Sequence, residues 1–335
     1  MNTLPDPEIH LSADEAEEVF GLLLDDEGLP EEQIASFLIG LTERSETAAE
    51  IAGAARALRA RLIPVASPPD AIDVCGTGGD GHHTLNVSTA VSLVVAAAGV
   101  PVAKHGNRAA SSRSGAADTL EVLGLDMAAA GRSAERSLNE LGICFLFAAN
   151  HHPAMRRIQP IRRRIGRRTI FNLMGPLSNP ARVESQLIGI ARPAYVPIYA
   201  SAKALLGTRH TMIVSGDEGL DELSLAGGNE VAQVQGNDFE MRRLSASVMH
   251  LDHAPVEAIR GGDPRHNAAA LRALLDGAPG PYRDAVLFNA AAALHVAGRG
   301  SDWLERRAIA EESLNSGRAR QLLVDWIAMT NDAAA

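Results

Sequence analysis

Two polar segments of this chain carry the residue types best suited to hold a phosphate-rich ligand. The first is Asp73–Gly81 (DVCGTGGDG), which places four glycines within residues 76–81 directly after a short apolar run. The second is Lys104–Arg108 (KHGNR), which is followed by Ser111 and Ser112. Bare backbone lets N–H groups approach an anion closely, and a lysine supplies a compact positive charge. Because each segment follows a strand-like run, we expect both to face one ligand.

The glycines first suggest a dinucleotide site, since Gly76, Gly78 and Gly81 match G-x-G-x-x-G. In such a site the helix starts within the motif, whereas here the polar residues 82–84 intervene. An acidic residue should also end the second strand, where this chain has Lys104. No Gly-Lys-Ser/Thr follows, so the loop is not a Walker A motif either. Taken alone, the loop is equally consistent with a tight turn.

The residues after the glycines strengthen the phosphate interpretation. Asn86–Thr89 (NVST) opens a hydrophobic segment with helical character. Free N–H groups and the dipole at a helix N-terminus favour an anion, although Asn86 and Ser88 can equally be simple helix caps. Lys104 is one of only two lysines in a chain that otherwise uses arginine. Together these groups suit a pyrophosphate or phosphoribosyl group with Mg²⁺, which commonly pairs protein oxygens with substrate phosphates.

Two further clusters have a functional and a plain structural interpretation. Asp221 and Glu222 are adjacent carboxylates in a loop, suitable for Mg²⁺ or simply a solvated turn. The segment 156–168 holds seven arginines, most of them expected on a solvated helix face, although one could fork a carboxylate. His151 and His152 have no third metal ligand nearby, so packing is the better explanation.

The surrounding pattern predicts an α/β fold. Residues 10–62 read as helices, with Ser12 and Glu15 forming a capping box, and a proline-rich linker follows at 64–70. From residue 71 short apolar runs alternate with helices, which predicts a mostly parallel buried sheet; its strands are expected at 71–75, 100–103, 143–147, 186–190 and 211–214. Residues 151–185 break the alternation and are expected to pack with the N-terminal helices. Strands at 231–235 and 239–244 and helices from residue 265 complete the chain.

Composition narrows the function classes. The 335 residues are 46% hydrophobic and 21% charged, as in a globular protein, and Cys75 and Cys144 are expected to be buried thiols. A net charge of −10 disfavours nucleic acid as a partner. The N-terminus lacks the pattern of a signal peptide, and the apolar run 93–103 is too short to span a membrane. We therefore expect a cytoplasmic protein without a membrane or nucleic-acid partner.

Six motifs in order resemble the anthranilate phosphoribosyltransferase family: GTGGDG, NVST, KHGNRAASSRSG, FAANHHPAM, RTIFNLMGPLSNPA and GLDELS. The resemblance implies transfer of a phosphoribosyl group from 5-phosphoribosyl-1-pyrophosphate to anthranilate, with release of pyrophosphate, in tryptophan biosynthesis. It implies a helical domain, 1–66 completed by about 151–185, and a larger α/β domain, 67–150 and 186–335, of the nucleoside phosphorylase/phosphoribosyltransferase type. It also implies a homodimer formed through the helical domain. Ser215 and Asn229 depart from the usual family residues, away from the expected site.

The resemblance also implies roles for individual residues. Two Mg²⁺ ions would be held by Ser88, Asp221 and Glu222, anthranilate by Gly76, Asn107 and Arg162, and no dedicated acid–base residue is expected. Phosphoribosyl pyrophosphate would be held by Gly76, Gly79, Asp80, Thr84, Asn86, Val87, Ser88, Thr89, Lys104, His105, Gly106, Asn107, Arg108, Ala109, Ala110, Ser111, Ser112 and Ala116.

Two other functions stay open at this point. A nucleoside phosphorylase of the same fold would split a nucleoside with phosphate, and a non-catalytic relative would bind nucleic acid through the arginine run. The lysine cluster and the Asp221–Glu222 pair favour the transferase over both.

Overall fold

The computed structural model describes residues 4–25, 28–109 and 113–333. Within these ranges the strands are β1 (Ile72–Gly76), β2 (Val102–Gly106), β3 (Ile143–Phe147), β4 (Ser185–Gly189), β5 (Thr208–Gly216), β6 (Gly228–Gly236) and β7 (Asp238–Ser245). The helices are α1 (Ala13–Asp25), α2 (Glu31–Arg44), α3 (Ala48–Arg59), α4 (Val87–Ala97), α5 (Ala116–Leu123), α6 (Met127–Arg132), α7 (Ala134–Leu141), α8 (Ala148–His151), α9 (Met155–Ile165), α10 (Met174–Leu177), α11 (Val196–Leu206), α12 (Pro264–Leu275), α13 (Pro281–Val296), α14 (Trp303–Asn315) and α15 (Arg318–Asp332). Short 3₁₀ turns occur at η1 (Ile170–Asn172), η2 (Pro193–Tyr195), η3 (Ala246–Met249) and η4 (Val256–Ile259).

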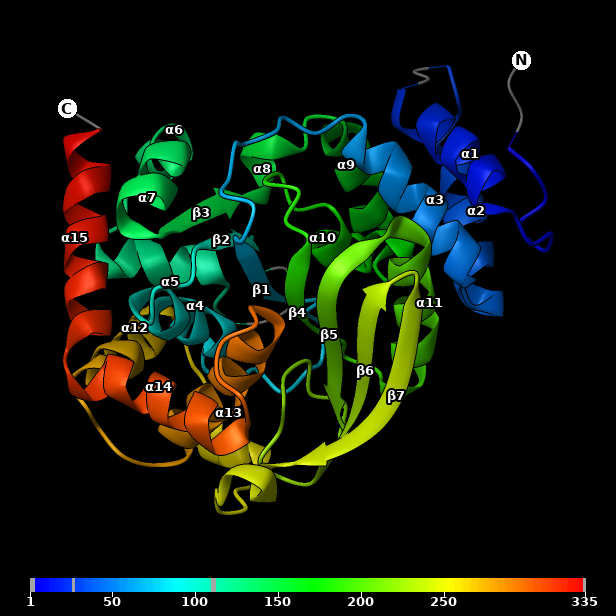
Figure 1. The fold of residues 1–335 in the computed structure, drawn as a ribbon. Helices are drawn as coiled ribbons and strands as arrows, with labels where there is room; N and C mark the ends of the chain where they lie inside the picture. Colours follow the sequence, from blue (N-terminus) through cyan, green and yellow to red (C-terminus); the bar gives the residue numbers. More distant parts are fainter. Residues whose placement is uncertain (1–3, 26–27, 110–112, 334–335) are drawn as a thin grey trace.

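The strands form one sheet in the order β3-β2-β1-β4-β5-β6-β7 (Figure 1). Strands β1 to β5 pair in parallel, and β6 and β7 add an antiparallel edge. The chain builds outward from β1 to β3 and then returns to the other side of β1 with β4. Such a reversal leaves a crevice at the carboxyl ends of the strands, which is where ligands bind in open α/β sheets.

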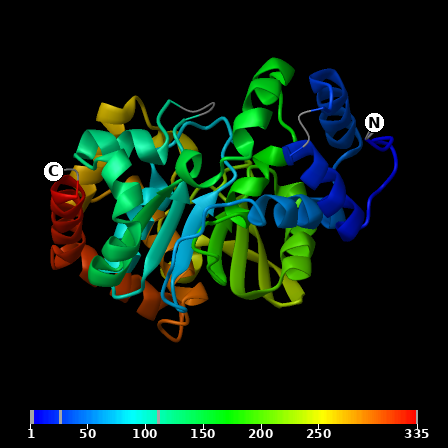
Figure 2. The ribbon, with the colours of Figure 1, turned by 90° about the horizontal axis from the view of Figure 1, so that it is seen from above.

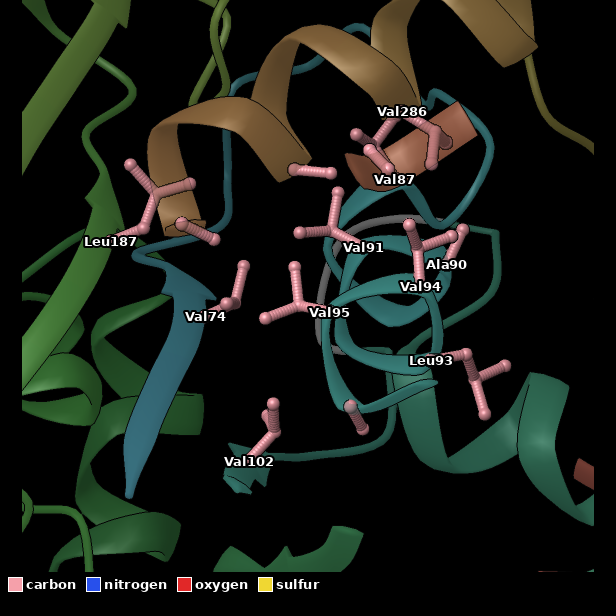
Figure 3. Packing of buried hydrophobic residues seen from close by; sticks show 14 of the residues in the cluster. Val74, Val87, Ala90, Val91, Leu93, Val94, Val95, Val102, Leu187 and Val286 are labelled. Atoms are coloured by element: carbon pink, nitrogen blue, oxygen red, sulfur yellow. The ribbon is translucent and has the colours of Figure 1, made fainter. Parts of the chain in front are cut away.

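One face of the sheet is covered by α4 and by helices of the last third of the chain. Val91 and Val95 of α4 point toward Val74 of β1, and Leu187 of β4 and Val286 of α13 belong to the same cluster (Figure 3). All five side chains are at most 1% exposed. Burial of each stabilises the fold by about 1.5–3 kcal/mol, so α4 and its N-terminus are firmly anchored.

The other face is covered by α11 and continues into the N-terminal helices. Ile188 on β4 and Ile213 on β5 share a core with Phe20 of α1, Phe37 of α2 and Ile161 of α9. Helix α9 packs against α1 and α2, and Figure 2 shows it beside these helices at the end of the molecule opposite α15. The segment between β3 and β4 therefore joins the helical end to the edge of the sheet where the strands finish.

The helical end is tied together by Glu50, which is fully buried in α3. Its carboxylate pairs with Arg44 and accepts the N–H groups of Leu11 at 3.0 Å and Thr47 at 2.9 Å. The predicted capping box at the start of α1 is present, since the Ser12 N–H donates to the Glu15 carboxylate at 2.8 Å. These contacts hold α1, α2 and α3 as one unit next to the cavity described below.

The predicted fold class is confirmed, and the expected strands coincide with β1 to β7 within a few residues. Both cysteines are buried and free, as expected. Helix α6 was not predicted, because its alanine-rich six residues show no clear period. None of the helices in the described ranges is long and apolar enough to cross a bilayer.

Candidate active site

A cavity of about 370 Å³ opens at the carboxyl ends of β1 and β2. Its wall combines the glycine loop after β1, the start of α4, the segment after β2 and the β5–β6 loop with Asp221 and Glu222. Every predicted site residue that the structure describes lines this cavity except Thr89. Thr89 is buried in the first turn of α4. Ala110, Ser111 and Ser112 lie outside the described residues.

Asp221 packs against two glycines that are paired on the neighbouring strands β1 and β4. Gly76 and Gly189 are in register, and a Cβ atom on either would overlap with Asp221. The N–H of Gly78 donates to the Asp221 carboxylate at 2.7 Å, and Gly78 adopts a positive φ of 68° that glycine tolerates. Close approach, rather than only loop flexibility, therefore explains why the strand ends are glycine.

The Glu222 carboxylate contacts the first turn of α4. Its Oε1 accepts the N–H of Ser88 at 3.1 Å, one of the free donors of the first helical turn. Burial, together with nearby Asp80, raises the pKa of Asp221 to about 7. Burial and the Asp221 charge raise the pKa of Glu222 to about 8. The fold without a ligand therefore disfavours ionisation of both carboxyl groups, and a cation bound beside them would favour their charged forms.

Two buried asparagines fix the loop that carries this pair. Asn289, inside the apolar helix α13, accepts the Leu223 N–H at 2.8 Å and donates to the Leu223 carbonyl at 2.9 Å. Asn229 of β6 accepts the Ser224 N–H at 2.7 Å. Asn229, one of the departures from the family residues, therefore does not line the cavity but supports its acidic wall.

Lys104 supplies positive charge from the middle of β2. It is only 2% exposed, and its Nζ donates to the Val74 carbonyl at 2.8 Å and the Ser88 hydroxyl at 3.2 Å. Burial lowers the pKa of Lys104, while the carboxylate of Asp73 beneath it opposes that shift. The ammonium fits a narrow space beside α4 that the wider planar fork of an arginine would crowd.

The acidic wall fits Mg²⁺. In the described part of the chain no group of three or more His, Cys, Asp or Glu is arranged to hold a metal ion. Asp221, Glu222 and the Ser88 hydroxyl nevertheless offer hard oxygens at one wall, and a cation there would favour the ionised forms of the two carboxyl groups. Mg²⁺ usually takes one or two protein carboxylates and completes its shell with substrate phosphates and water.

A second cavity of about 220 Å³ shares His105, Asn107 and Arg162 with the first. The Arg162 guanidinium lies 6.0 Å from the centre of the Phe171 ring, and none of the described carboxylates is within 4.0 Å of it. Burial lowers the pKa of His105 to about 4 and of His152 to about 3, so both are neutral at pH 7. Arg162 and the exposed Arg156 thus lie among neutral and apolar groups, an arrangement that suits a small aromatic acid.

Two family models together match most of the chain. The glycosyl transferase family, helical bundle domain, matches residues 6–62, and the glycosyl transferase family, a/b domain, matches residues 68–320. The chain is 74% identical to the anthranilate phosphoribosyltransferase of Erythrobacter litoralis, covering 98% of this chain and 99% of that protein. It is 64% identical to that of Novosphingobium aromaticivorans, with the same coverage. The chain belongs to the anthranilate phosphoribosyltransferase family.

Solved structures of this family have the same fold. The Thermus thermophilus enzyme is 41% identical, with a TM-score of 0.88 over 96% of this chain and 97% of that one. The Saccharomyces cerevisiae enzyme in complex with phosphoribosyl pyrophosphate and Mg is 30% identical, with a TM-score of 0.87 over 96% and 94%. The structure of the Saccharomyces cerevisiae enzyme in complex with 4-fluoroanthranilate is 29% identical in sequence, with a TM-score of 0.84 over 96% of this chain and 94% of that one.

Four of the seven arginines in the run are exposed, as expected for a solvated face, whereas Arg157, Arg162 and Arg168 are partly buried. Arg164 pairs with Glu31 and Arg167 with Glu43, all four exposed, whereas Arg162 reaches the cavities. Arg168, which the sequence did not single out, is half-buried, and its guanidinium lies beside Gly79 of the glycine loop. Sequence position gave no signal for this, because the contact joins residues almost ninety positions apart.

Arg108 lines the main cavity, but its charge is directed elsewhere. Its guanidinium pairs with Asp118 at 3.0 Å and with Glu121 at 2.8 Å, both on α5. Asp118 also accepts the N–H groups of Ala109 and Gly115, each at 2.9 Å. Side chains of α5 therefore brace the segment after β2, and we expect Arg108 to contribute to its shape more than to phosphate binding.

The close contact of Gly76 and Gly189 with Asp221 predicts the effect of adding a methyl group at one of these glycines. Gly189→Ala should displace Asp221 and lower the affinity for Mg²⁺-pyrophosphate at least tenfold, because the new Cβ overlaps with the main chain of Asp221. Gly227→Ala is the matched control, since no atom lies within 4 Å of its added Cβ. Calorimetric titration of both variants measures this. Equal affinities of the two variants for Mg²⁺-pyrophosphate would show that the contact with Gly189 does not position Asp221.

Proposed function

We propose that the protein transfers the phosphoribosyl group of 5-phosphoribosyl-1-pyrophosphate to the amine of anthranilate, with the residues predicted above as its site. The observation that carries the proposal is the pair of joined cavities, one walled by phosphate-binding groups and the other by Arg162. The family relatives and their complexes with both kinds of ligand support it. No feature of these comparisons favours the nucleoside phosphorylase or the nucleic-acid-binding alternative.

The site would act mainly by placing and stabilising charge. As the bond from ribosyl C1 to the pyrophosphate oxygen breaks, its electron pair leaves with the pyrophosphate. The N–H groups of the glycine loop and the Lys104 ammonium would stabilise that charge. Bound Mg²⁺ at Asp221 and Glu222 would supply further stabilisation of the leaving oxygens.

The second substrate would be held by the smaller cavity. Arg162 would bind the anthranilate carboxylate and direct the amine at the ribosyl carbon. The new bond joins that nitrogen to C1, and the proton of the amine passes to solvent. Because an aromatic amine is neutral at pH 7, the attack needs no base to make it nucleophilic.

We also propose finer features that the resemblance implies. Two Mg²⁺ ions would bind, the first near Ser88 and the second at Asp221 and Glu222, and residues 1–66 with 151–185 would form the domain that faces the α/β domain across the substrates. These features would place both metal ions and both substrates between the two domains.

A homodimer through the helical domain would cover Ile9 and Ile63, which are 59% and 51% exposed. Sedimentation at the mass of one chain would contradict the dimer. Location in the cytoplasm is tested by cell fractionation.

A direct assay tests the reaction. Purified protein, anthranilate, phosphoribosyl pyrophosphate and Mg²⁺ should together cause loss of anthranilate fluorescence, and omission of any component should prevent it. Phosphorolysis of a nucleoside without loss of anthranilate would contradict the proposal and favour the phosphorylase. Salt-sensitive DNA binding without turnover would favour the nucleic-acid-binding alternative.

Arg162 gives a substrate-specific prediction. Arg162→Ala should raise KM for anthranilate about 10- to 100-fold, as expected for loss of a hydrogen-bonded charge, with little change in KM for phosphoribosyl pyrophosphate. Arg163→Ala is the matched control, because Arg163 is exposed next to it. Steady-state kinetics with each substrate varied in turn measures both constants. Equal effects of the two variants would remove Arg162 from the anthranilate site.

A further inference from the structure

Asn86 precedes α4, where an asparagine side chain would ordinarily cap the helix, yet it makes no side-chain cap bond. Its Oδ1 instead accepts the hydroxyl of Thr119 at 2.6 Å and the Nδ2 of Asn267 at 2.9 Å. Both partners are buried, at 0% and 2% exposure, and neither lines the cavity. The helix-cap explanation of Asn86 is therefore wrong, and its side chain is held for another purpose.

The orientation of the Asn86 amide is set from a main-chain group. The N–H of Gly262 donates to the Oδ1 of Asn267 at 2.8 Å. Since a main-chain N–H can only donate, the opposite end of the Asn267 amide facing Asn86 must be its nitrogen. That nitrogen also donates, so Asn86 must present oxygen to it. The main-chain N–H of Gly262 thus fixes the orientation of the Asn267 amide, which in turn fixes that of Asn86.

Thr119 supports the same orientation from α5 with a second hydrogen bond to the Asn86 oxygen. Its hydroxyl carries one proton, which is donated to Asn86, and it can accept from the Ser114 hydroxyl 2.8 Å away. Both lone pairs of Asn86 Oδ1 are then occupied by donors on two helices. Helices α5 and α12 pack against each other, so the two donors have a fixed separation.

The fixed oxygen leaves the Asn86 nitrogen on the side of the loop after β2. Its contact with the Ser114 carbonyl is 3.4 Å long and therefore weak, and both Asn86 and Ser114 line the cavity, so this nitrogen keeps the capacity to donate to a ligand there. A phosphate oxygen only accepts hydrogen bonds. A flipped amide would present oxygen to that anion and replace an attraction by a repulsion.

We propose that Thr119 and Asn267 are positioning residues that fix the Asn86 amide with its nitrogen toward a phosphate group of the substrate. The proposal rests on the proposed function, because it assumes phosphoribosyl pyrophosphate as the ligand beside Asn86. The two residues touch no substrate themselves and act through Asn86 alone.

The experiment compares KM for each substrate, kcat and calorimetric Kd for phosphoribosyl pyrophosphate. Thr119→Val, which keeps shape and loses the hydroxyl, should raise KM and Kd for that substrate about tenfold, with kcat and KM for anthranilate changed less than twofold. Thr119→Ser, which keeps the hydroxyl, should restore wild-type values. Thr330→Val is the matched control, a buried threonine of α15 whose hydroxyl, among the residues that the structure describes, donates to the Ile327 carbonyl alone.

A second variant reverses the orientation instead of loosening it. Asn267→Asp keeps the acceptor for Gly262 but turns an oxygen toward Asn86, so the Asn86 amide should flip and KM for phosphoribosyl pyrophosphate should rise more than in Thr119→Val. In an Asn86→Ala background neither variant should raise KM further. This readout holds even if one of the two variants folds poorly.

Two results would overturn the proposal. One is a wild-type KM and Kd in both Thr119→Val and Asn267→Asp. The other is an increase of the same size with and without Asn86, which would mean that these residues act on the fold in general. Failure of the proposed function is a separate result, in which the unmodified protein itself neither binds phosphoribosyl pyrophosphate nor consumes anthranilate.

Discussion

The structure depends on two adjacent carboxylates, Asp221 and Glu222, held side by side in the wall of a cavity. Burial raises the pKa of both groups, helped by Asp80 at Asp221 and by Asp221 at Glu222, so the fold holds the pair where ionisation is costly. Glycines at matched positions of β1 and β4 give Asp221 its space, and Asn289 holds the next residue of the loop in place. A divalent cation with a polyphosphate is the kind of ligand that balances such a site.

The sheet explains how the opposite charges reach the same cavity. The order in which strands are added to the sheet reverses between β3 and β4, so the carboxyl ends of β1, β2 and β4 border one crevice. Lys104 arrives on β2, the N–H groups arrive on α4, and the carboxylates arrive from beyond β5. The segment between β3 and β4 joins the helical end and carries Arg162 to the same place. A cation for the second substrate thus lies beside the phosphate site without belonging to the sheet.

The fold and most of the cavity lining could be predicted because they depend on local signals. Apolar runs ended by glycine marked β1, β2 and β4, and the ordered motifs pointed to nearly all the residues that now line the cavity. What escaped prediction are contacts between distant segments. Arg168 beside Gly79, Asn267 bonded to Asn86 and Arg108 turned to α5 each depend on tertiary packing, which no spacing encodes. Asn289 was the exception, because the sequence shows it as a single amide inside an alanine-rich helical segment.

The measurement that tests the account most directly is the unfolding midpoint of Asp221→Asn with and without Mg²⁺ and phosphoribosyl pyrophosphate. Because burial and Asp80 raise the pKa of Asp221 to about 7, its ionisation destabilises the ligand-free fold as pH rises, so the neutral variant should unfold at a higher temperature than the wild type at pH 8. The same variant should lose the stabilisation that the ligands give the wild type, which is about 2.7 kcal/mol at a hundred times Kd. A ligand-free variant less stable than the wild type, or one stabilised equally by the ligands, would contradict the account.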